Sequence, residues 1–154
     1  MLKRAIGGMV LPMNTQEHTQ STQEHNKAVV RDCYAQASAG NFDALPDLVT
    51  DDYLLHPDGI RGADGLAQMV QGHRDAILDL SVTIDHQFAE DEFVATRFTL
   101  RGHHVTDHDV AVTGLALSRI SDGKIAEEWE IVDVMTLLAQ IGQSPSPETS
   151  SVQS

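Results

Sequence analysis

The sequence predicts a single α+β domain. A curved, mainly antiparallel (mixed) sheet wraps around a pocket as a cone, with three N-terminal helices packed on its concave side. Up to about residue 79 the apolar residues recur at helical spacing, whereas from Ser81 onward they alternate with polar residues. Helices followed by an antiparallel meander are typical of the α+β class. The 154 residues are enough for one domain with a buried core.

The three helices are expected at about residues 24–39, 41–49 and 64–79. In the first helix, the apolar side chains fall at positions i, i+3, i+4 and i+7 and form one stripe: Val30, Cys33, Tyr34 and Ala37. In the third helix, the predicted inner face consists of Leu66, Met69, Val70, His73 and Ile77.

Five strands are expected to form the sheet. A short strand at 51–56 stops at Pro57, and four longer strands, joined as hairpins, follow at about 81–89, 93–105, 110–120 and 124–134. A last helical turn at 135–140 closes the domain, which spans 24–142. The flanking residues are polar and poor in large apolar side chains, so we expect a disordered leader at 1–23 and a disordered tail at 143–154.

The composition excludes several classes of partner. Ten Lys and Arg stand against 23 Asp and Glu, which gives a net charge of −13 and a pI near 4.7. Such a surface repels phosphate backbones and anionic headgroups, so we expect neither nucleic acid nor a membrane as partner. Cys33 is the only cysteine, which excludes an intramolecular disulfide. The apolar run at 5–11 is short, contains two glycines and lacks a cleavage site, which favours a cytoplasmic protein over a secreted one.

Asp133 is the first candidate catalytic residue. Side chains alternate along a strand, so Asp133 shares one face of the last strand with Trp129 and Ile131. These two apolar residues indicate that this face lines the pocket. A carboxylate among apolar neighbours has a raised pKa and can shuttle protons near neutral pH. The alternative is a strand-end aspartate that caps the helix after it.

His104 follows from the same alternation. It shares a face with Phe98 and Leu100, which predicts that it enters the same pocket from a neighbouring strand. A histidine and an aspartate across a dry pocket can act as an acid–base pair without a metal. The alternative is a histidine with ordinary hydrogen bonds at the rim of the sheet.

Seven further residues are predicted to line the substrate pocket, on the evidence of their helix stripes and strand faces: Tyr34, Tyr53, His56, Met69, His73, Phe98 and Trp129. Tyr53 and His56 lie on opposite faces of one strand, and the sequence does not decide which of them points inward. The segment from His103 to Asp109 contains His and Asp ligand types, but its spacing favours a solvated hairpin tip over a metal site. No metal or organic cofactor is therefore expected.

Several motifs carry a resemblance to a known family. They are Arg97-Phe98 with Gly102-His103-His104, the segment Ser-Arg-Ile-Ser-Asp-Gly-Lys-Ile at 118–125 followed by Glu128-Trp129, and the ending from Asp133 to Gly142. With these motifs the chain resembles the SnoaL-like polyketide cyclases of the nuclear transport factor 2-like superfamily, over roughly 25–142. In that family, the aspartate matching Asp133 is the acid–base residue of an aldol closure, and the histidine matching His104 supports it.

The chain departs from the family at one loop. The resemblance implies a long loop after the histidine strand, but here Val105 to Val110 form a tight hairpin. That loop shapes the mouth of the cyclase pocket, so an anthracycline-type substrate does not follow from the resemblance.

The expected function is cofactor-free acid–base chemistry on a small hydrophobic molecule, most simply as a polyketide-type cyclase. Two alternatives stay open on this fold: an enzyme that opens epoxides, as a hydrolase or a cyclase, and a non-catalytic module for ligand binding or dimerisation. A homodimer joined through the outer face of the sheet is also expected, because Val132 and Val134 alternate opposite the predicted pocket side and the superfamily commonly forms such dimers.

Overall fold

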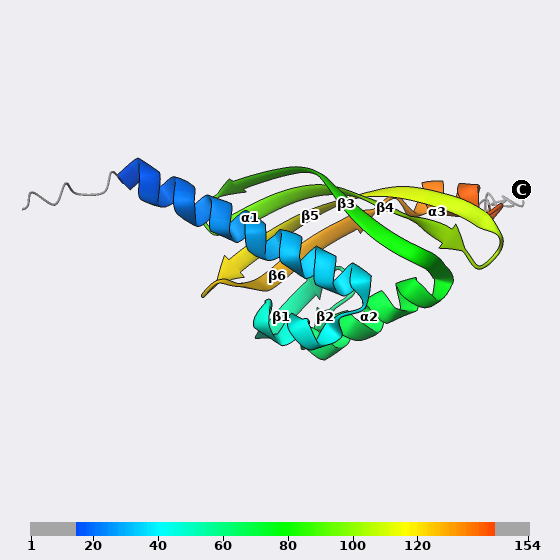
Figure 1. Cartoon of the computed structure of the whole chain (residues 1–154), viewed down its shortest axis with the longest axis horizontal. Helices are drawn as coiled ribbons and strands as arrows, with labels where there is room; N and C mark the ends of the chain where they lie inside the picture. The colour runs from blue at the N-terminus through cyan, green and yellow to red at the C-terminus, as the bar shows by residue number, and fades with distance from the viewer. Residues whose placement is uncertain (1–14, 144–154) are drawn as a thin grey trace, which may run out of the picture.

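The computed structural model describes residues 15–143 and confirms the α+β class. The elements follow in the order α1 (Thr15–Ala39), the 3₁₀ helix η1 (Phe42–Asp47), β1 (Val49–His56), β2 (Ile60–Arg61), α2 (Gly62–Ala76), β3 (Ile77–Glu90), β4 (Phe93–His104), β5 (His108–Ser121), β6 (Lys124–Val132) and α3 (Val134–Gln140). Figure 1 shows α1 and α2 on one side of the sheet, with α3 following the end of β6.

The six strands form one mixed sheet in the order β2-β1-β6-β5-β4-β3. β1 pairs with β6 in parallel, and the other neighbours are antiparallel. Each hairpin turns at an aspartate with positive φ, namely Asp91, Asp107 or Asp122. Aspartate tolerates this left-handed conformation better than most residues, which explains why the predicted turn positions agree with the structure.

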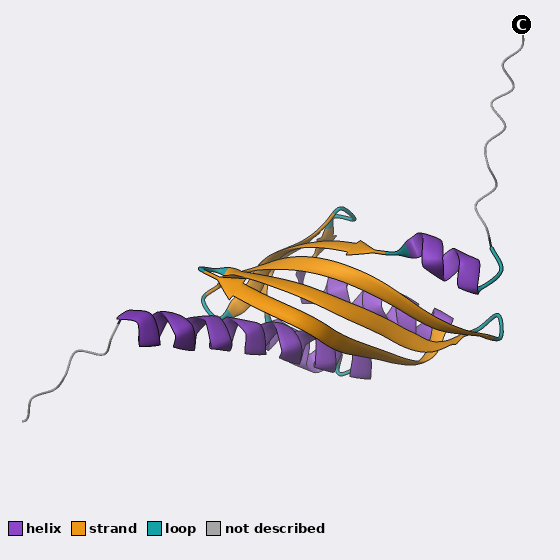
Figure 2. Ribbon diagram, turned by 90° about the horizontal axis from the view of Figure 1, so that it is seen from above, coloured by secondary structure: helices purple, strands orange, loops and turns teal. Residues whose placement is uncertain are grey.

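Two predicted boundaries are wrong. Helix α1 begins at Thr15, so residues 15–23 are helical and do not belong to a disordered leader. Their polar side chains lack an apolar stripe because this part of α1 extends past the end of the sheet (Figure 2). The third predicted helix ends early, at Ala76, because Ile77 already pairs with β4. Residues 1–14 and 144–154, and the disorder predicted for them, lie outside the described residues.

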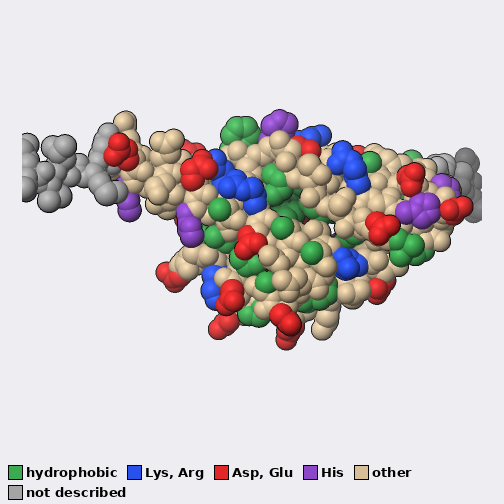
Figure 3. All heavy atoms as spheres, viewed as in Figure 1, with side chains coloured by type: hydrophobic (Ala, Val, Ile, Leu, Met, Phe, Trp, Pro, Cys, Tyr) green, Lys and Arg blue, Asp and Glu red, His purple; other side chains and the backbone are tan. Residues whose placement is uncertain are grey.

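The core lies between the helices and the face of the sheet that α1 and α2 cover, called the inner face below. Its fully buried side chains come from both layers and include Val30, Leu45, Val94 and Ile125. Acidic side chains are spread over the surface seen in Figure 3, as the net charge of −13 requires. Among residues 15–143, no helix combines the length and apolar character needed to cross a membrane.

The strand register decides which side chains of β6 reach the inner face. Glu128 pairs with Ser118 of β5, and both are buried. The alternate residues Trp129 and Ile131 pair with Leu117 and Leu115, and all four of these side chains are exposed on the opposite, outer face. The predicted orientation of β6 is therefore reversed, since Glu128 and Glu130 point toward the helices and Trp129 points away from them.

Candidate active site

A cavity lies between α1, α2 and the inner face of the sheet, and the centre of a water-sized sphere can occupy about 70 Å³ of it. Most of its wall is apolar and comes from α2, β3 and β4: Leu66, Met69, Val70, Leu80, Val82, Phe98 and Leu100. Six polar side chains also line it: Tyr34, Ser38, Tyr53, His73, Glu128 and Glu130. An apolar pocket with a few converging polar groups is the usual form of a small-molecule site.

Glu128 is the most deeply buried carboxyl group of the cavity. Only 5% of the residue is exposed. The hydroxyl of Ser118 donates a hydrogen bond of 3.2 Å to Oε2, and the hydroxyl of Tyr34 lies 3.2 Å from Oε1. Desolvation, followed by the charge of Glu130, raises the pKa of Glu128 to about 8, against the opposing effect of its two hydrogen bonds. Glu128 is therefore mostly protonated at neutral pH.

Glu130 is the next inward-facing residue of β6 and is half-buried. Its Oε2 lies 3.3 Å from the same Tyr34 hydroxyl. Desolvation raises the pKa of Glu130, the hydrogen bond from Tyr34 opposes this effect, and the negative charge of Asp58 adds to it. A carboxylate with a raised pKa, placed beside an apolar cavity, has the properties of a general base.

Tyr34 links the two carboxyl groups. It comes from the inner stripe of α1, and its ring packs against Phe98 with a centroid distance of 5.2 Å. Burial, followed by the charges of Glu128 and Glu130, raises the pKa of Tyr34 well above its ordinary value. The phenol therefore stays protonated, and its one hydrogen can be donated to either of the two glutamates.

Tyr53 and His73 bring further polar groups to the cavity. Tyr53 is buried on β1, whereas His56 on the same strand faces outward, which decides the question that the sequence left open. Neither the Tyr53 hydroxyl nor the His73 ring has a hydrogen-bond partner within residues 15–143. Desolvation lowers the pKa of His73 despite the charge of Asp58, so its ring is neutral at pH 7. Both side chains are free to bind a ligand.

Asp133 does not lie in this cavity, so its expected inward position is wrong. Its carboxylate accepts hydrogen bonds from the Thr136 backbone N–H at 3.0 Å and from the Thr136 hydroxyl at 2.7 Å. It caps α3 at the protein surface, and the hydrogen bonds from Thr136 lower its pKa. The error follows from the reversed orientation of β6, and the helix-capping alternative matches the observed geometry.

This position leads to a first prediction. Replacing Asp133 by alanine removes the cap of a short, surface-exposed helix, so we expect a small decrease in melting temperature and an unchanged cavity. Differential scanning fluorimetry of Asp133→Ala and Asp133→Asn measures this change. A variant that is fully unfolded at 25 °C would contradict a role limited to capping.

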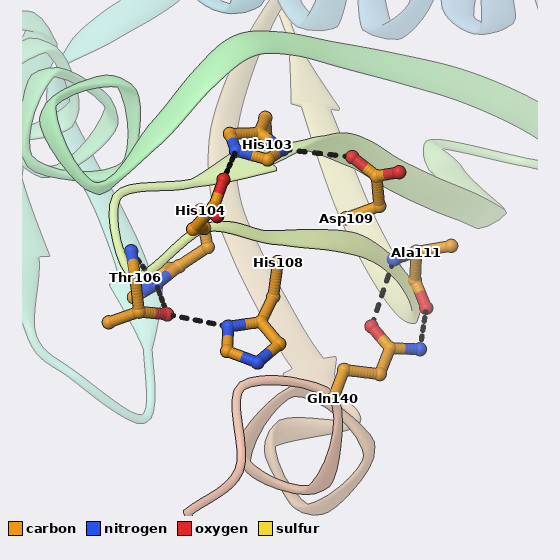
Figure 4. Close-up of polar contacts among 8 residues, drawn as sticks. His103, His104, Thr106, His108, Asp109, Ala111 and Gln140 are labelled. Carbon is orange, nitrogen blue, oxygen red and sulfur yellow. Dashed lines mark hydrogen bonds and ion pairs between the residues drawn. The ribbon is translucent and has the colours of Figure 1, made fainter.

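His104 also lies outside the cavity, although the predicted orientation of its strand is correct for Phe98 and Leu100. It stands at the end of β4, where its Nδ1 lies 2.8 Å from the Thr106 hydroxyl, which is 3.2 Å from His108 Nδ1 (Figure 4). The same hairpin holds His103 between Asp109 and Asp107, whose hydrogen bonds raise its pKa. His104 therefore belongs to a polar hairpin tip at the end of the sheet, and its expected entry into the pocket is wrong.

His56 and Trp129 were predicted to line the pocket, but they stack on each other on the outer face. Their ring centroids are 5.3 Å apart, and His56 Nε2 lies 2.8 Å from Glu127. Tyr34, Tyr53, Met69, His73 and Phe98 do border the cavity. Within residues 15–143, no group of three or more His, Cys, Asp or Glu side chains is arranged to hold a metal ion.

The sequence interpretation missed Glu128 and Glu130. Two carboxylates at positions i and i+2 of one strand share a face, and the inward stripe of α1 already contained Tyr34 as a polar partner. That combination is a usable signal. Trp129 and Ile131 outweighed it, because large apolar residues are normally assigned to the covered face of a sheet.

Comparisons with known proteins agree with this architecture. The model of the SnoaL-like polyketide cyclase family matches residues 28–141. A structure from Bacillus cereus ATCC 10987, assigned as a polyketide cyclase, is 25% identical, with a TM-score of 0.72 over 79% of this chain and 83% of that one. IdmH from Streptomyces antibioticus, also assigned as a polyketide cyclase, is 26% identical, with a TM-score of 0.68 over 76% and 98% of the two chains.

A third structure, TsrD from Streptomyces laurentii, shares the fold at 21% identity, with a TM-score of 0.73 over 79% of this chain and 97% of that one. A comparison with curated protein sequences finds no match. The family model covers most of the chain, and the described fold agrees with it. The chain therefore belongs to the SnoaL-like polyketide cyclase family.

Proposed function

We propose that this protein is an acid–base enzyme of cyclase type that acts on a small, hydrophobic carbonyl compound. The observation that carries the proposal is the pair of carboxyl groups, Glu128 and Glu130, in the wall of a mostly apolar cavity. Among residues 15–143, no Lys or Arg lines this cavity, so its environment favours an uncharged substrate over an anionic one.

Glu130 is the proposed general base. Its carboxylate removes a proton from the carbon next to a substrate carbonyl, and the electron pair of the broken C–H bond moves to form an enolate. The free Tyr53 hydroxyl and the neutral ring of His73 are the proposed donors to the enolate oxygen. Donors that are fixed in a dry site stabilise such a charge strongly.

In the second half of an aldol closure, Glu130 acts as an acid and gives back the proton that it removed. The enolate carbon attacks a second carbonyl of the same molecule and forms a new C–C bond. Glu130 then returns its proton to the new alkoxide, which restores the carboxylate. The apolar walls supplied by Met69, Val70 and Phe98 exclude water from the enolate. No proton is gained or lost over the cycle.

Carbon-acid exchange tests this function without knowledge of the natural substrate. We expect the protein to accelerate exchange of the α-protons of neutral ketones such as 2-tetralone in D₂O, with saturation at high ketone concentration, as followed by ¹H NMR. Ketones of graded size test the fit to the cavity. An exchange rate equal to that of buffer for every ketone in the series would contradict the proposal.

We also propose that two copies of the chain associate through the outer face of the sheet. Cross-strand register brings exposed apolar side chains together there, and Phe88 and Ile131 are 72% and 75% exposed. This outer apolar patch consists of Phe88, Leu115, Leu117, Trp129 and Ile131. It replaces the Val132 and Val134 surface on which the sequence-based expectation relied. Contiguous apolar patches of this kind usually mark protein interfaces.

Light scattering tests the dimer. The wild-type protein is expected at twice the 16.8 kDa chain mass, and Ile131→Glu at the mass of one chain, because a buried charge without a partner opposes association. Met135→Glu, at an exposed apolar residue of α3, is the matched control and is expected to remain a dimer. A wild-type protein that stays monomeric throughout the micromolar range would contradict the proposal.

A further inference from the structure

One hydroxyl group contacts two carboxyl groups in the cavity. Tyr34 Oη lies 3.2 Å from Glu128 Oε1 and 3.3 Å from Glu130 Oε2. A phenol has a single hydrogen, so it can donate to only one of these two oxygens. The other contact is a hydrogen bond only when that carboxyl group is protonated and donates to Tyr34 Oη. Both contacts are therefore separate hydrogen bonds only if one of the two carboxyl groups carries a proton in addition to that of the phenol.

Among residues 15–143, no positively charged side chain faces the pair and could replace this proton. The polar or titratable groups that face it are Cys33 and Tyr34 from α1, Tyr53 from β1, His73 from α2, Ser118 from β5 and Asp58 from the β1–β2 turn. Burial keeps Cys33 as a thiol and His73 as a neutral ring. Two ionised carboxylates would thus repel each other with no positive charge from these residues to offset the repulsion, and Asp58 would increase it.

Burial indicates which of the two glutamates carries the proton. Glu128 is almost completely enclosed, whereas Glu130 is half-buried. The hydroxyl of Ser118 already donates to Glu128 Oε2, which leaves Oε1 as the oxygen that can hold a hydrogen directed toward Tyr34. The raised pKa of Glu128, about 8, agrees with this assignment.

We propose that, besides the phenol proton of Tyr34, the Glu128–Tyr34–Glu130 group holds a single carboxyl proton in the free protein, with hydrogen bonds running from the protonated Glu128 to Tyr34 and from Tyr34 to the ionised Glu130. Glu128 and Tyr34 are then positioning residues. They hold Glu130 Oε2 in place, leave its second oxygen available to a substrate, and set the proton affinity of Glu130. The benefit to turnover rests on the proposed function, whereas the single carboxyl proton is a property of the protein alone.

Carboxyl NMR tests for the single carboxyl proton without any substrate. Protein labelled with ¹³C at the glutamate side-chain carboxyl is titrated from pH 4 to pH 10, and the two signals are assigned by their loss in Glu128→Gln and Glu130→Gln. We expect the two groups to titrate in well-separated steps, with Glu128 still protonated at pH 7 while Glu130 is ionised. Two ionised carboxylates at pH 6 would overturn the proposal.

Two variants test whether the titrations of Glu128 and Glu130 are coupled through Tyr34 or whether the two groups are merely close together. In Tyr34→Phe the hydrogen bond that Tyr34 donates to the ionised Glu130 is lost, so the titration midpoint of Glu130 is expected to move to higher pH. In Glu128→Gln the upper step should disappear, and the Glu130 signal should titrate in one step. A Glu130 titration curve that is identical in the wild type and in both variants would overturn the proposed coupling.

The matched control is Glu127→Gln, whose side chain contacts His56 and Arg119 on the other face of β6 and should leave both steps in place. If Tyr34→Phe does not fold, the wild-type titration still decides the proposal, because the protonation state at pH 7 is read from the unmodified protein. A ketone-exchange assay that fails while this titration succeeds would remove the proposed function and leave the single carboxyl proton in place.

Discussion

Glu130→Gln is expected to reduce ketone deprotonation by at least about 100-fold, because general base catalysis contributes a factor of about 10² to 10⁴. Glutamine has nearly the same shape, and its amide oxygen can still accept the hydrogen bond from Tyr34. The fold should therefore survive while the base is lost. The exchange rate of 2-tetralone α-protons, measured by NMR at saturating ketone, gives the effect directly.

The control for this variant is Glu127→Gln, which removes a carboxylate three positions earlier on β6, on the outer face. It is expected to keep the wild-type exchange rate, since Glu127 does not border the cavity. A Glu130→Gln protein that is folded and retains more than half of the wild-type rate would remove Glu130 from the mechanism.

The second large effect concerns the pH dependence of stability. The pKa of Glu128 is about 8 in the folded protein, against an ordinary value of 4.5 for a glutamate side chain in water. Between these pH values the folded state binds more protons than the unfolded state, so the free energy of unfolding falls as the pH rises from about 4.5 to about 8. A pKa shift of this size corresponds to a change in the free energy of unfolding on the order of a few kcal/mol.

Glu128→Gln should remove most of this slope, because an amide does not titrate. The variant is expected to be close to wild type at pH 5 and more stable than wild type at pH 9, where the native protein carries a buried charge. Urea denaturation at both pH values measures the difference. If the free energy of unfolding changed equally with pH in the two proteins, Glu128 would not be the group that causes the pH dependence.

Much of the fold could be predicted from the sequence because its patterns are local. The Asp-containing turns, the stripe of α1 from Val30 to Ala37 and the change of period near Ser81 each reflect the geometry of a few neighbouring residues. The beginning of α1 could not be predicted in this way, because its first residues extend beyond the sheet and have no covered face to reveal them.

The site was harder to predict because it depends on which face of β6 the helices cover. Alternation shows that Glu128 and Glu130 share a face, but it does not say which face is inside. Trp129 and Ile131 suggested the wrong one, because they form an exposed apolar patch and not part of the core. In the sequence, the apolar residues of this exposed face thus have the same alternating pattern as the buried face of a core strand.

The parallel comparison of Glu130→Gln with Asp133→Asn tests the central claim most directly, because the two variants separate the cavity carboxylates from the helix cap. Both proteins are assayed for exchange of 2-tetralone α-protons under identical conditions, after their folding has been verified by circular dichroism. We predict that Asp133→Asn keeps the wild-type rate while Glu130→Gln loses at least about 100-fold. Loss of exchange in Asp133→Asn with full activity in Glu130→Gln would contradict the account and place the chemistry at the end of β6.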